Sequence, residues 1–152
     1  MTYELAIERL MDAPVGAVWR AFADHLGECW CPRPWRAEIV AQELRPGGRS
    51  AMVMHGPDGE KMPQEGVYLE VVPDRRVVFT DAFASGWVPQ GPFMVGFLEL
   101  TPEGERTRYR AGARHWTAEA CDQHKAMGFE AGWGAVAAQC EEVARRLAES
   151  GT

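Results

Sequence analysis

Turn-forming residues recur at short intervals through the middle of this chain, and this spacing constrains its fold more than any other feature. The segments between the turns favour strands by their alternation and composition, at 36–44, 49–55, 65–72, 76–83, 93–101 and 106–115. A parallel crossover needs about a dozen residues, so the short connections permit only antiparallel hairpins. Turns with glycine or proline are predicted at 45–48, 56–59, 73–75 and 102–105. The middle of the chain is therefore predicted to be a six-strand antiparallel meander.

Helical patterns flank this meander. After an opening strand at 2–11, Asp12 and Pro14 predict the start of a short helix over 14–22, because aspartate caps helices and proline is tolerated in the first turn. From Thr117 to about residue 149 the apolar residues follow a helical period, which predicts one helix about 50 Å long at 1.5 Å per residue. Its apolar face would carry Phe129, Trp133, Val136, Cys140, Val143 and Leu147.

Three glycines interrupt the predicted long helix. Each of Gly128, Gly132 and Gly134 should cost about 1 kcal/mol relative to alanine in a helix interior. Two interpretations stay open: the helix backbone closely approaches the sheet or a bound ligand, or the helix is kinked or loose at these positions.

The order of elements predicts an α+β fold. In this fold a curved antiparallel β-sheet is wrapped around the long C-terminal helix, with an internal cavity between the two layers. A chain of 152 residues fits one hydrophobic core and still has room for such a cavity, so we expect a single domain over residues 1–152.

Charge and composition exclude several functional classes. The net charge is −6 and the isoelectric point about 5.2, without a run of lysine or arginine, so nucleic acid is not an expected partner. The N-terminus lacks the pattern of a secretory signal, and no window holds the roughly 18 apolar residues of a membrane span. Cysteines at 29, 31, 121 and 140 lack the spacing of a disulfide scaffold. These features predict a cytoplasmic protein with reduced thiols.

Several motifs, taken in order along the chain, resemble one known group of proteins. They are DAPVGAVWRAF at 12–22, the tryptophan loop at 30–35, RPGG at 45–48, GPDG at 56–59, EGVYLEVVPDRRVVFT at 65–80, LTPEGERTRYR at 100–110 and GFEAGW at 128–133. Together they resemble the START-like, or SRPBCC, superfamily with its helix-grip fold, and within it the family named for the activator of the heat-shock chaperone ATPase. The resemblance spans almost the whole chain and implies a hydrophobic cavity between sheet and long helix.

Strand alternation predicts which side chains face that cavity. In 106–115, Tyr109 and His115 share one face, whereas Arg108, Arg110 and Arg114 share the other. Three arginines cannot be buried together, so the face with Tyr109 and His115 is predicted to point inward.

Asp81 departs from the pattern that the resemblance implies. Phe79 and Asp81 share one face of strand 76–83, and the similar proteins carry an aromatic residue at the position of Asp81. An inward Asp81 could pair with His115, so that the two orient a polar ligand group or serve as acid and base. The alternative is that Asp81 turns to water or caps the following loop.

The segment CWCPRPW at 29–35 admits two interpretations. Cys29 and Cys31 could join Cys121 and His124 in a zinc site, although the single residue between Cys29 and Cys31 is shorter than structural zinc sites use. The resemblance instead implies that Trp30 lies at the mouth of the cavity, in a rim shared with Trp35 and stiffened by prolines. We expect this rim, with reduced thiols and no metal.

Two apolar features suggest contacts beyond the cavity. Trp87 lies in the longest predicted loop, 84–92, and could act in a lid over the cavity or anchor a dimer partner. Alternation in strand 93–101 turns either Phe93, Val95 and Phe97 or Met94, Gly96 and Leu98 outward. Either set would make an apolar patch, which suggests a possible homodimer.

These observations predict a protein that binds a small hydrophobic or amphipathic ligand without a cofactor. The predicted ligand-binding residues are Trp30, Phe79, Asp81, Tyr109, His115, Phe129 and Trp133. The resemblance leaves two alternatives: an enzyme of the polyketide cyclase or hydrolase type that uses His115 and Asp81, and a chaperone-interaction module of the stress response that acts through its surface.

Overall fold

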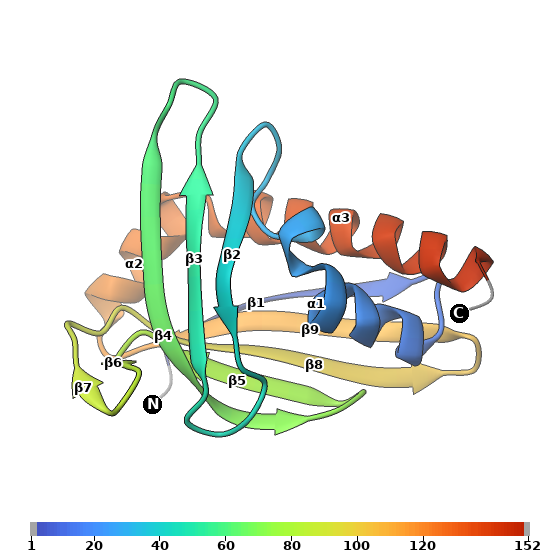
Figure 1. The fold of residues 1–152 in the computed structure, drawn as a ribbon, viewed down its shortest axis with the longest axis horizontal. Helices are drawn as coiled ribbons and strands as arrows, with labels where there is room; N and C mark the ends of the chain where they lie inside the picture. Colours follow the sequence, from blue (N-terminus) through green and yellow to red (C-terminus); the bar gives the residue numbers. More distant parts are fainter. Residues whose placement is uncertain (1–2, 151–152) are drawn as a thin grey trace.

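The chain forms one large antiparallel sheet with three helices, as a computed structural model shows for residues 3–150 (Figure 1). The order of strands in this 7-stranded sheet is β1-β9-β8-β5-β4-β3-β2. Its strands are β1 (Tyr3–Met11), β2 (Arg36–Gln42), β3 (Arg49–His55), β4 (Lys61–Val72), β5 (Arg76–Thr80), β8 (Val95–Glu103) and β9 (Arg106–His115). A separate small hairpin pairs β6 (Phe83–Ala84) with β7 (Val88–Pro89). The predicted α+β class and antiparallel meander are confirmed.

The β3–β4 hairpin is longer than the alternation predicted. β4 begins at Lys61 rather than at residue 65, and β5 pairs with it only from Val67 onward. The first half of β4 therefore pairs with β3 alone, and no strand pairs with its other edge, where the missing N–H of Pro63 breaks no strand pairing. Figure 1 shows this hairpin standing upright, well beyond the end of β5, which gives the sheet its curvature.

The helices differ from their predicted lengths. α1 extends over Val15–Cys29 rather than 14–22 and is bent at His25, whose backbone is not helical. The single helix predicted over 117–149 is wrong, because the structure divides it into α2 (Ala118–Ala126) and α3 (Phe129–Glu149). Gly128 separates them with φ 94°, a left-handed conformation that glycine adopts without a Cβ penalty. None of the helices in residues 3–150 is long and apolar enough to cross a membrane.

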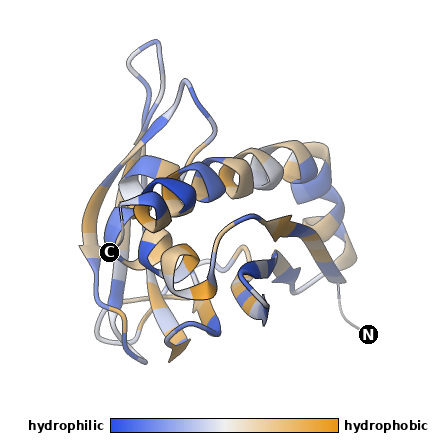
Figure 2. Cartoon of the chain, turned by 90° about the vertical axis from the view of Figure 1, so that its right-hand side faces the viewer, coloured by the Kyte–Doolittle hydropathy of each residue, from blue (hydrophilic) through white to orange (hydrophobic). Residues whose placement is uncertain are grey.

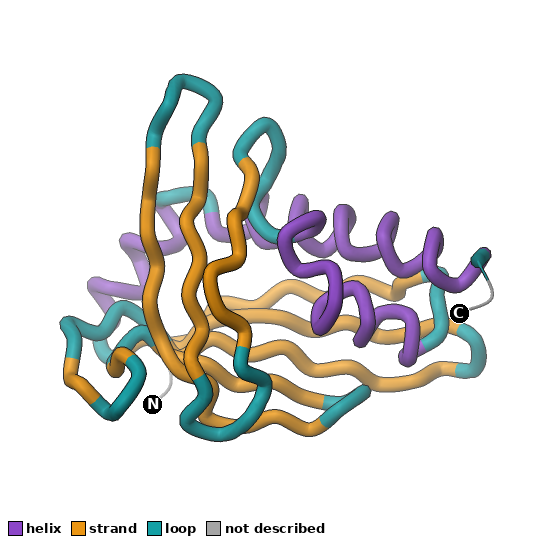
Figure 3. Tube along the Cα trace, viewed as in Figure 1, coloured by secondary structure: helices purple, strands orange, loops and turns teal. Residues whose placement is uncertain are grey.

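The core lies between the concave side of the sheet and helices α1 and α3. Figure 3 shows all three helices on one side of the curved sheet, with α3 running along β1 and β9. Figure 2 shows hydrophobic and hydrophilic residues mixed on both helices and strands, as expected for elements with one buried face. Val18 and Phe22 of α1 pack in one buried cluster with Val136, Cys140 and Val143 of α3.

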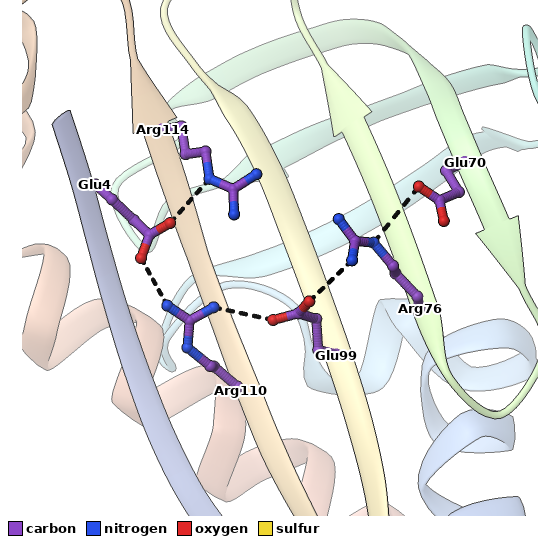
Figure 4. A network of polar contacts seen from close by, with 6 residues as sticks. All are labelled: Glu4, Glu70, Arg76, Glu99, Arg110 and Arg114. Carbon is purple, nitrogen blue, oxygen red and sulfur yellow. Dashed lines mark hydrogen bonds and ion pairs between the residues drawn. The ribbon is translucent and has the colours of Figure 1, made fainter. Parts of the chain in front are cut away.

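The convex side of the sheet carries the arginines, as predicted. Glu99 on β8 accepts hydrogen bonds from Arg76 and Arg110, and Glu4 on β1 accepts from Arg110 and Arg114. The network lies on five strands, β1, β9, β8, β5 and β4. Figure 4 shows its residues, which are Glu4, Arg110, Arg114, Glu99, Arg76 and Glu70. Charged side chains thereby remain paired across the outer face.

The predicted apolar patch on the outer face is wrong. Phe97 does point to the convex side, but it is only 1% exposed because the guanidinium groups of Arg110 and Arg114 lie 4.9 and 5.0 Å from its ring centre. Leu98, on the other face of β8, is buried in the core. The self-association suggested by this patch loses its support, because neither side chain forms exposed apolar surface.

Candidate functional site

A pocket of about 920 Å³ lies between the inner face of β3, β4 and β5 and the start of α3. The loop at 90–94 and the loop at 30–32 complete its walls. Its apolar lining residues include Trp30, Val40, Met52, Met54, Met62, Phe79, Phe93, Met127, Trp133 and Val136. Arg49, Gln64, Glu65, Asp81, Gln90 and His124 contribute polar groups. The pocket is thus mostly apolar, with a few polar side chains, which is the usual composition of a small-molecule site.

Five of the seven predicted site residues line this pocket: Trp30, Phe79, Asp81, Tyr109 and Trp133. The other two, His115 and Phe129, do not belong to its lining; both rings pack against His124, which does. Sequence alternation placed His115 on the inner face correctly, but His115 is bonded to His124, and of the two only His124 lines the pocket.

Three aromatic rings that line the pocket meet edge to face. The ring centre of Trp30 lies 6.4 Å from that of Phe79 and 6.1 Å from that of Trp133, and both contacts are T-shaped. Phe79 occupies the space that a side chain at position 96 would take, since a Cβ on Gly96 would lie 2.3 Å from its ring. Three elements, the 29–35 loop, β5 and α3, therefore supply one aromatic wall.

The loop at 29–35, here called the mouth loop, is held in place by a single buried side chain, Gln139 of α3. Its amide nitrogen donates to the carbonyl oxygens of Cys29 and Cys31, both at 2.9 Å, and its amide oxygen accepts from the backbone N–H of Arg33. Cys31 has φ 69°, a left-handed backbone conformation that an ordinary residue adopts only when its surroundings impose it. Sequence periodicity did not predict Gln139, because a polar residue inside an apolar helix face carries no sign of its partner.

The cysteines of this loop do not form the alternative zinc site. Within residues 3–150 no three His, Cys, Asp or Glu side chains are grouped so that they could hold a metal ion. Cys31 is buried, and burial raises the pKa of its thiol to about 11, so it remains protonated near neutral pH. Trp30 lines the pocket as the rim interpretation predicted, whereas Trp35 lies toward Gly56 at the β3–β4 turn.

Asp81 does not pair with His115. One of its carboxylate oxygens accepts hydrogen bonds from the backbone N–H groups of Phe93 and Met94, at 2.8 and 3.2 Å. The carboxylate thus holds the loop that returns to β8, which is the capping role left open by the sequence. The predicted Asp81–His115 pair is therefore wrong. The carboxylate of Asp81 accepts hydrogen bonds from two nearby backbone N–H groups instead of pairing with the histidine.

His115 pairs instead with a second histidine. Its Nε2 lies 2.8 Å from Nδ1 of His124, and its Nδ1 lies 3.0 Å from the carbonyl oxygen of Tyr3. His124 is buried against the rings of Phe93, Phe129 and Trp133. Burial, together with the nearby His115, lowers the pKa of His124. The sequence had considered His124 only as a ligand of the alternative zinc site with Cys29, Cys31 and Cys121, because the helix break before α3 was not predicted.

The loop at 84–92 contributes to the pocket through its end and not through Trp87. Trp87 packs edge-on against Phe83 and over Gly47, and it is not among the lining residues. Gln90 lines the pocket and donates to the carbonyl oxygens of Glu65 and Asp81. The predicted lid role of Trp87 is therefore not what the structure shows; its role as a dimer anchor stays a prediction.

A curved antiparallel sheet that holds a C-terminal helix over a largely apolar pocket defines the START-like class with the helix-grip fold. The chain belongs to the family described as Activator of Hsp90 ATPase homolog 1-like protein, whose family profile matches residues 12–145. The resemblance inferred from the sequence motifs is thereby confirmed.

Solved structures of proteins from several bacteria show the same fold. A protein from Nitrosomonas europaea is 36% identical, with 96% of each chain covered and a TM-score of 0.89. A protein from Mycobacterium smegmatis is 28% identical, covering 93% of this chain and 90% of its own, with a TM-score of 0.78. A third, from Arthrobacter aurescens, is 25% identical, covers 95% and 87%, and has a TM-score of 0.82. A comparison with curated proteins gives no match.

Proposed function

We propose that this protein binds a small hydrophobic or amphipathic molecule in the pocket between the sheet and α3. The observation that carries the proposal is the pocket itself, whose volume of about 920 Å³ falls in the range of about 300–1,000 Å³ found for small-molecule sites. Burial of the ligand's apolar surface would supply most of the affinity, at about 25 cal/mol per Å² before the costs of binding.

The lining supports a binding site that tolerates different ligand shapes. Met52, Met54 and Met62 lie on neighbouring strands along one wall, and methionine side chains adapt because they are unbranched and flexible. Trp30 and Trp133, which also line the pocket, provide rigid aromatic surface. We expect broad selectivity for ligand shape, with specificity set by the few polar groups.

The two alternatives from the sequence have less support. An enzyme that uses Asp81 and His115 as acid and base would need the two side chains together, and Asp81 is instead bonded to backbone N–H groups. A chaperone-interaction module would act through its surface, and no feature of residues 3–150 selects a surface for it. A cytoplasmic location and self-association stay predictions from the sequence.

A substitution that fills the pocket tests the proposal. Gly132 of α3 lines the pocket, and a Cβ there would meet only Pro32, at 3.9 Å, so Gly132→Leu places a side chain in the open space without a clash at its base. Titration with methoxynaphthalene, followed by tryptophan fluorescence and calorimetry, should show affinity about tenfold weaker or worse in this variant, because the added side chain takes the ligand's volume.

Gly134→Leu is the matched control for this variant. It lies on the same helix, has no atom within 4 Å of an added Cβ, and does not line the pocket, so its affinity should stay within about twofold of wild type. Equal affinities in the Gly132→Leu variant and wild type would place the ligand elsewhere and contradict the proposal.

Native mass spectrometry of the freshly purified protein should show a retained small molecule.

A further inference from the structure

One end of the pocket contains two buried histidines joined in a chain of hydrogen bonds. The chain runs from the carbonyl oxygen of Tyr3 on β1 through His115 on β9 to His124 on α2. The two residues are 7% and 8% exposed, and no ion pair in residues 3–150 involves either of them; the histidines that form ion pairs are His25 and His55.

The carbonyl oxygen of Tyr3 sets the first direction. A carbonyl only accepts, so Nδ1 of His115 must carry the proton and donate to it. If Nε2 of His115 were protonated as well, the ring would be a cation without a carboxylate partner in a buried site, which is costly. His115 is therefore neutral, with a lone pair at Nε2.

The second direction follows from the first. The lone pair on Nε2 of His115 faces Nδ1 of His124 at 2.8 Å, so Nδ1 of His124 must carry a proton and donate it. Burial and the neighbouring His115 lower the pKa of His124, which favours its neutral form. A neutral ring protonated at Nδ1 has a lone pair at Nε2.

Nε2 of His124 is the one ring nitrogen of the two histidines that has no hydrogen-bond partner in residues 3–150. Among the side-chain nitrogens and oxygens of these residues, only Arg76 Nε is both fully buried and without a partner, so Nε2 of His124 is not fully buried. It therefore retains accessible surface, and His124 is a lining residue of the pocket. The rings of Phe93, Phe129 and Trp133 surround His124 with apolar surface, so its nitrogen is an isolated acceptor among aromatic rings.

We propose that Nε2 of His124 accepts a hydrogen bond from a hydroxyl group of the ligand, and that the ligand is a neutral phenol or alcohol with an apolar body. This inference rests on the proposed ligand-binding function and names the ligand class for the same pocket. His115 is a positioning residue: through its bond to Tyr3 it holds His124 in the tautomer that accepts. A carboxylate ligand is disfavoured at this end, because a lone pair repels an anion.

Naphthol and its methyl ether, methoxynaphthalene, form a matched pair of probes that differ in the hydroxyl proton. Wild-type protein should bind naphthol about five- to tenfold more tightly, the size expected for one hydrogen bond in a partly desolvated site. His124→Asn should abolish this preference, so that the variant binds the two probes with equal affinity, because the shorter amide reaches the position of Nδ1 but not that of Nε2. His124→Gln, whose amide reaches the position of Nε2, should restore part of it.

The outcomes separate this inference from the proposed function. An unchanged preference in His124→Asn, or equal affinity of wild type for the two probes, would overturn the role of His124 and leave the pocket as the binding site. Failure of both probes to bind the wild type would contradict the proposed function for this ligand class and the inference with it.

The tautomers themselves can be measured without any ligand. Long-range proton–nitrogen correlation spectra of isotope-labelled protein near neutral pH should show both histidines protonated at Nδ1 and bare at Nε2. A His124 ring protonated at Nε2 would overturn the inference whatever the probes do. In His115→Gln, where an amide oxygen replaces the acceptor, His124 should keep its tautomer; in His115→Leu it should not.

Discussion

At the scale of single residues, the pocket depends on side chains that satisfy backbone groups. Asp81 accepts from two N–H groups of the returning loop, and Gln139 bonds three backbone groups of the mouth loop. Loops carry many backbone donors and acceptors that no strand or helix pairs, so a buried polar side chain that satisfies several of them fixes the loop's shape. These two residues therefore position Trp30 and Phe93 at the pocket.

We expect Gln139→Met to lower the free energy of unfolding by about 2 kcal/mol, because it leaves buried backbone groups of Cys29, Cys31 and Arg33 without partners. Urea denaturation measures this loss, and the tryptophan emission should shift as Trp30 loses its fixed position. Gln123→Met on the exposed part of α2 is the control, with a change within about 0.5 kcal/mol. Equal effects of the two variants would show that the mouth loop does not depend on Gln139.

At the scale of elements, the break between α2 and α3 decides what the pocket contains. A continuous helix over 117–149 would have carried residues 118–126 along the axis of α3. The left-handed Gly128 instead ends α2 and lets His124 pack against Phe129 and Trp133 of the next helix. Gly132 and Gly134 follow in the first turns of α3, where no other residue is close to either backbone position except Pro32.

Two glycine-to-alanine substitutions should therefore have opposite effects. Gly128→Ala should destabilise the fold by about 1 kcal/mol, because alanine is strained at φ 94°. Gly134→Ala should stabilise it by about 0.5–1 kcal/mol, because alanine favours the helix and an added Cβ meets no atom within 4 Å. Thermal and urea unfolding measure both. Stabilisation by both substitutions would mean that the helix is continuous through residue 128 in solution.

At the scale of the whole molecule, the two sides of the sheet carry different kinds of side chains. The concave side holds the helices, the core and the pocket, whereas the convex side holds a network of carboxylates and guanidinium groups. Burial opposes the charge of Glu4, but hydrogen bonds from Arg114 and Arg110 outweigh it and lower the pKa of this carboxyl below 4.5. Titratable groups on both sides, Glu4 on the convex side and His124 on the concave side, make the stability of the fold depend on pH.

Stability should fall in two steps as the pH is lowered. The pKa of His124 is below 6.5 in the folded chain, so the folded state resists protonation there and loses stability as the pH falls below about 6.5. Glu4 has a lowered pKa as well, so its contribution is present above 4.5 and is lost as the pH falls through the lower folded value. Denaturant unfolding over this pH range measures both steps.

His124→Asn provides the control for the first step, since asparagine does not titrate. It should remove the loss of stability that begins near pH 6.5 and leave the loss below pH 4.5 unchanged. If the first step persists in this variant, another group causes it, and the assignment to His124 is wrong.

The sequence by itself determined the class of fold, the antiparallel meander, the inward face of β9 and most of the pocket's aromatic wall. These features follow from local signals, because turn residues and side-chain alternation act within a few positions of the chain. Only the tertiary structure decided that His124 would meet His115, that Asp81 would hold a loop, and that Gln139 would hold the pocket mouth. Each of these depends on which distant backbone or side-chain group lies within hydrogen-bond reach, and residue spacing carries no record of it.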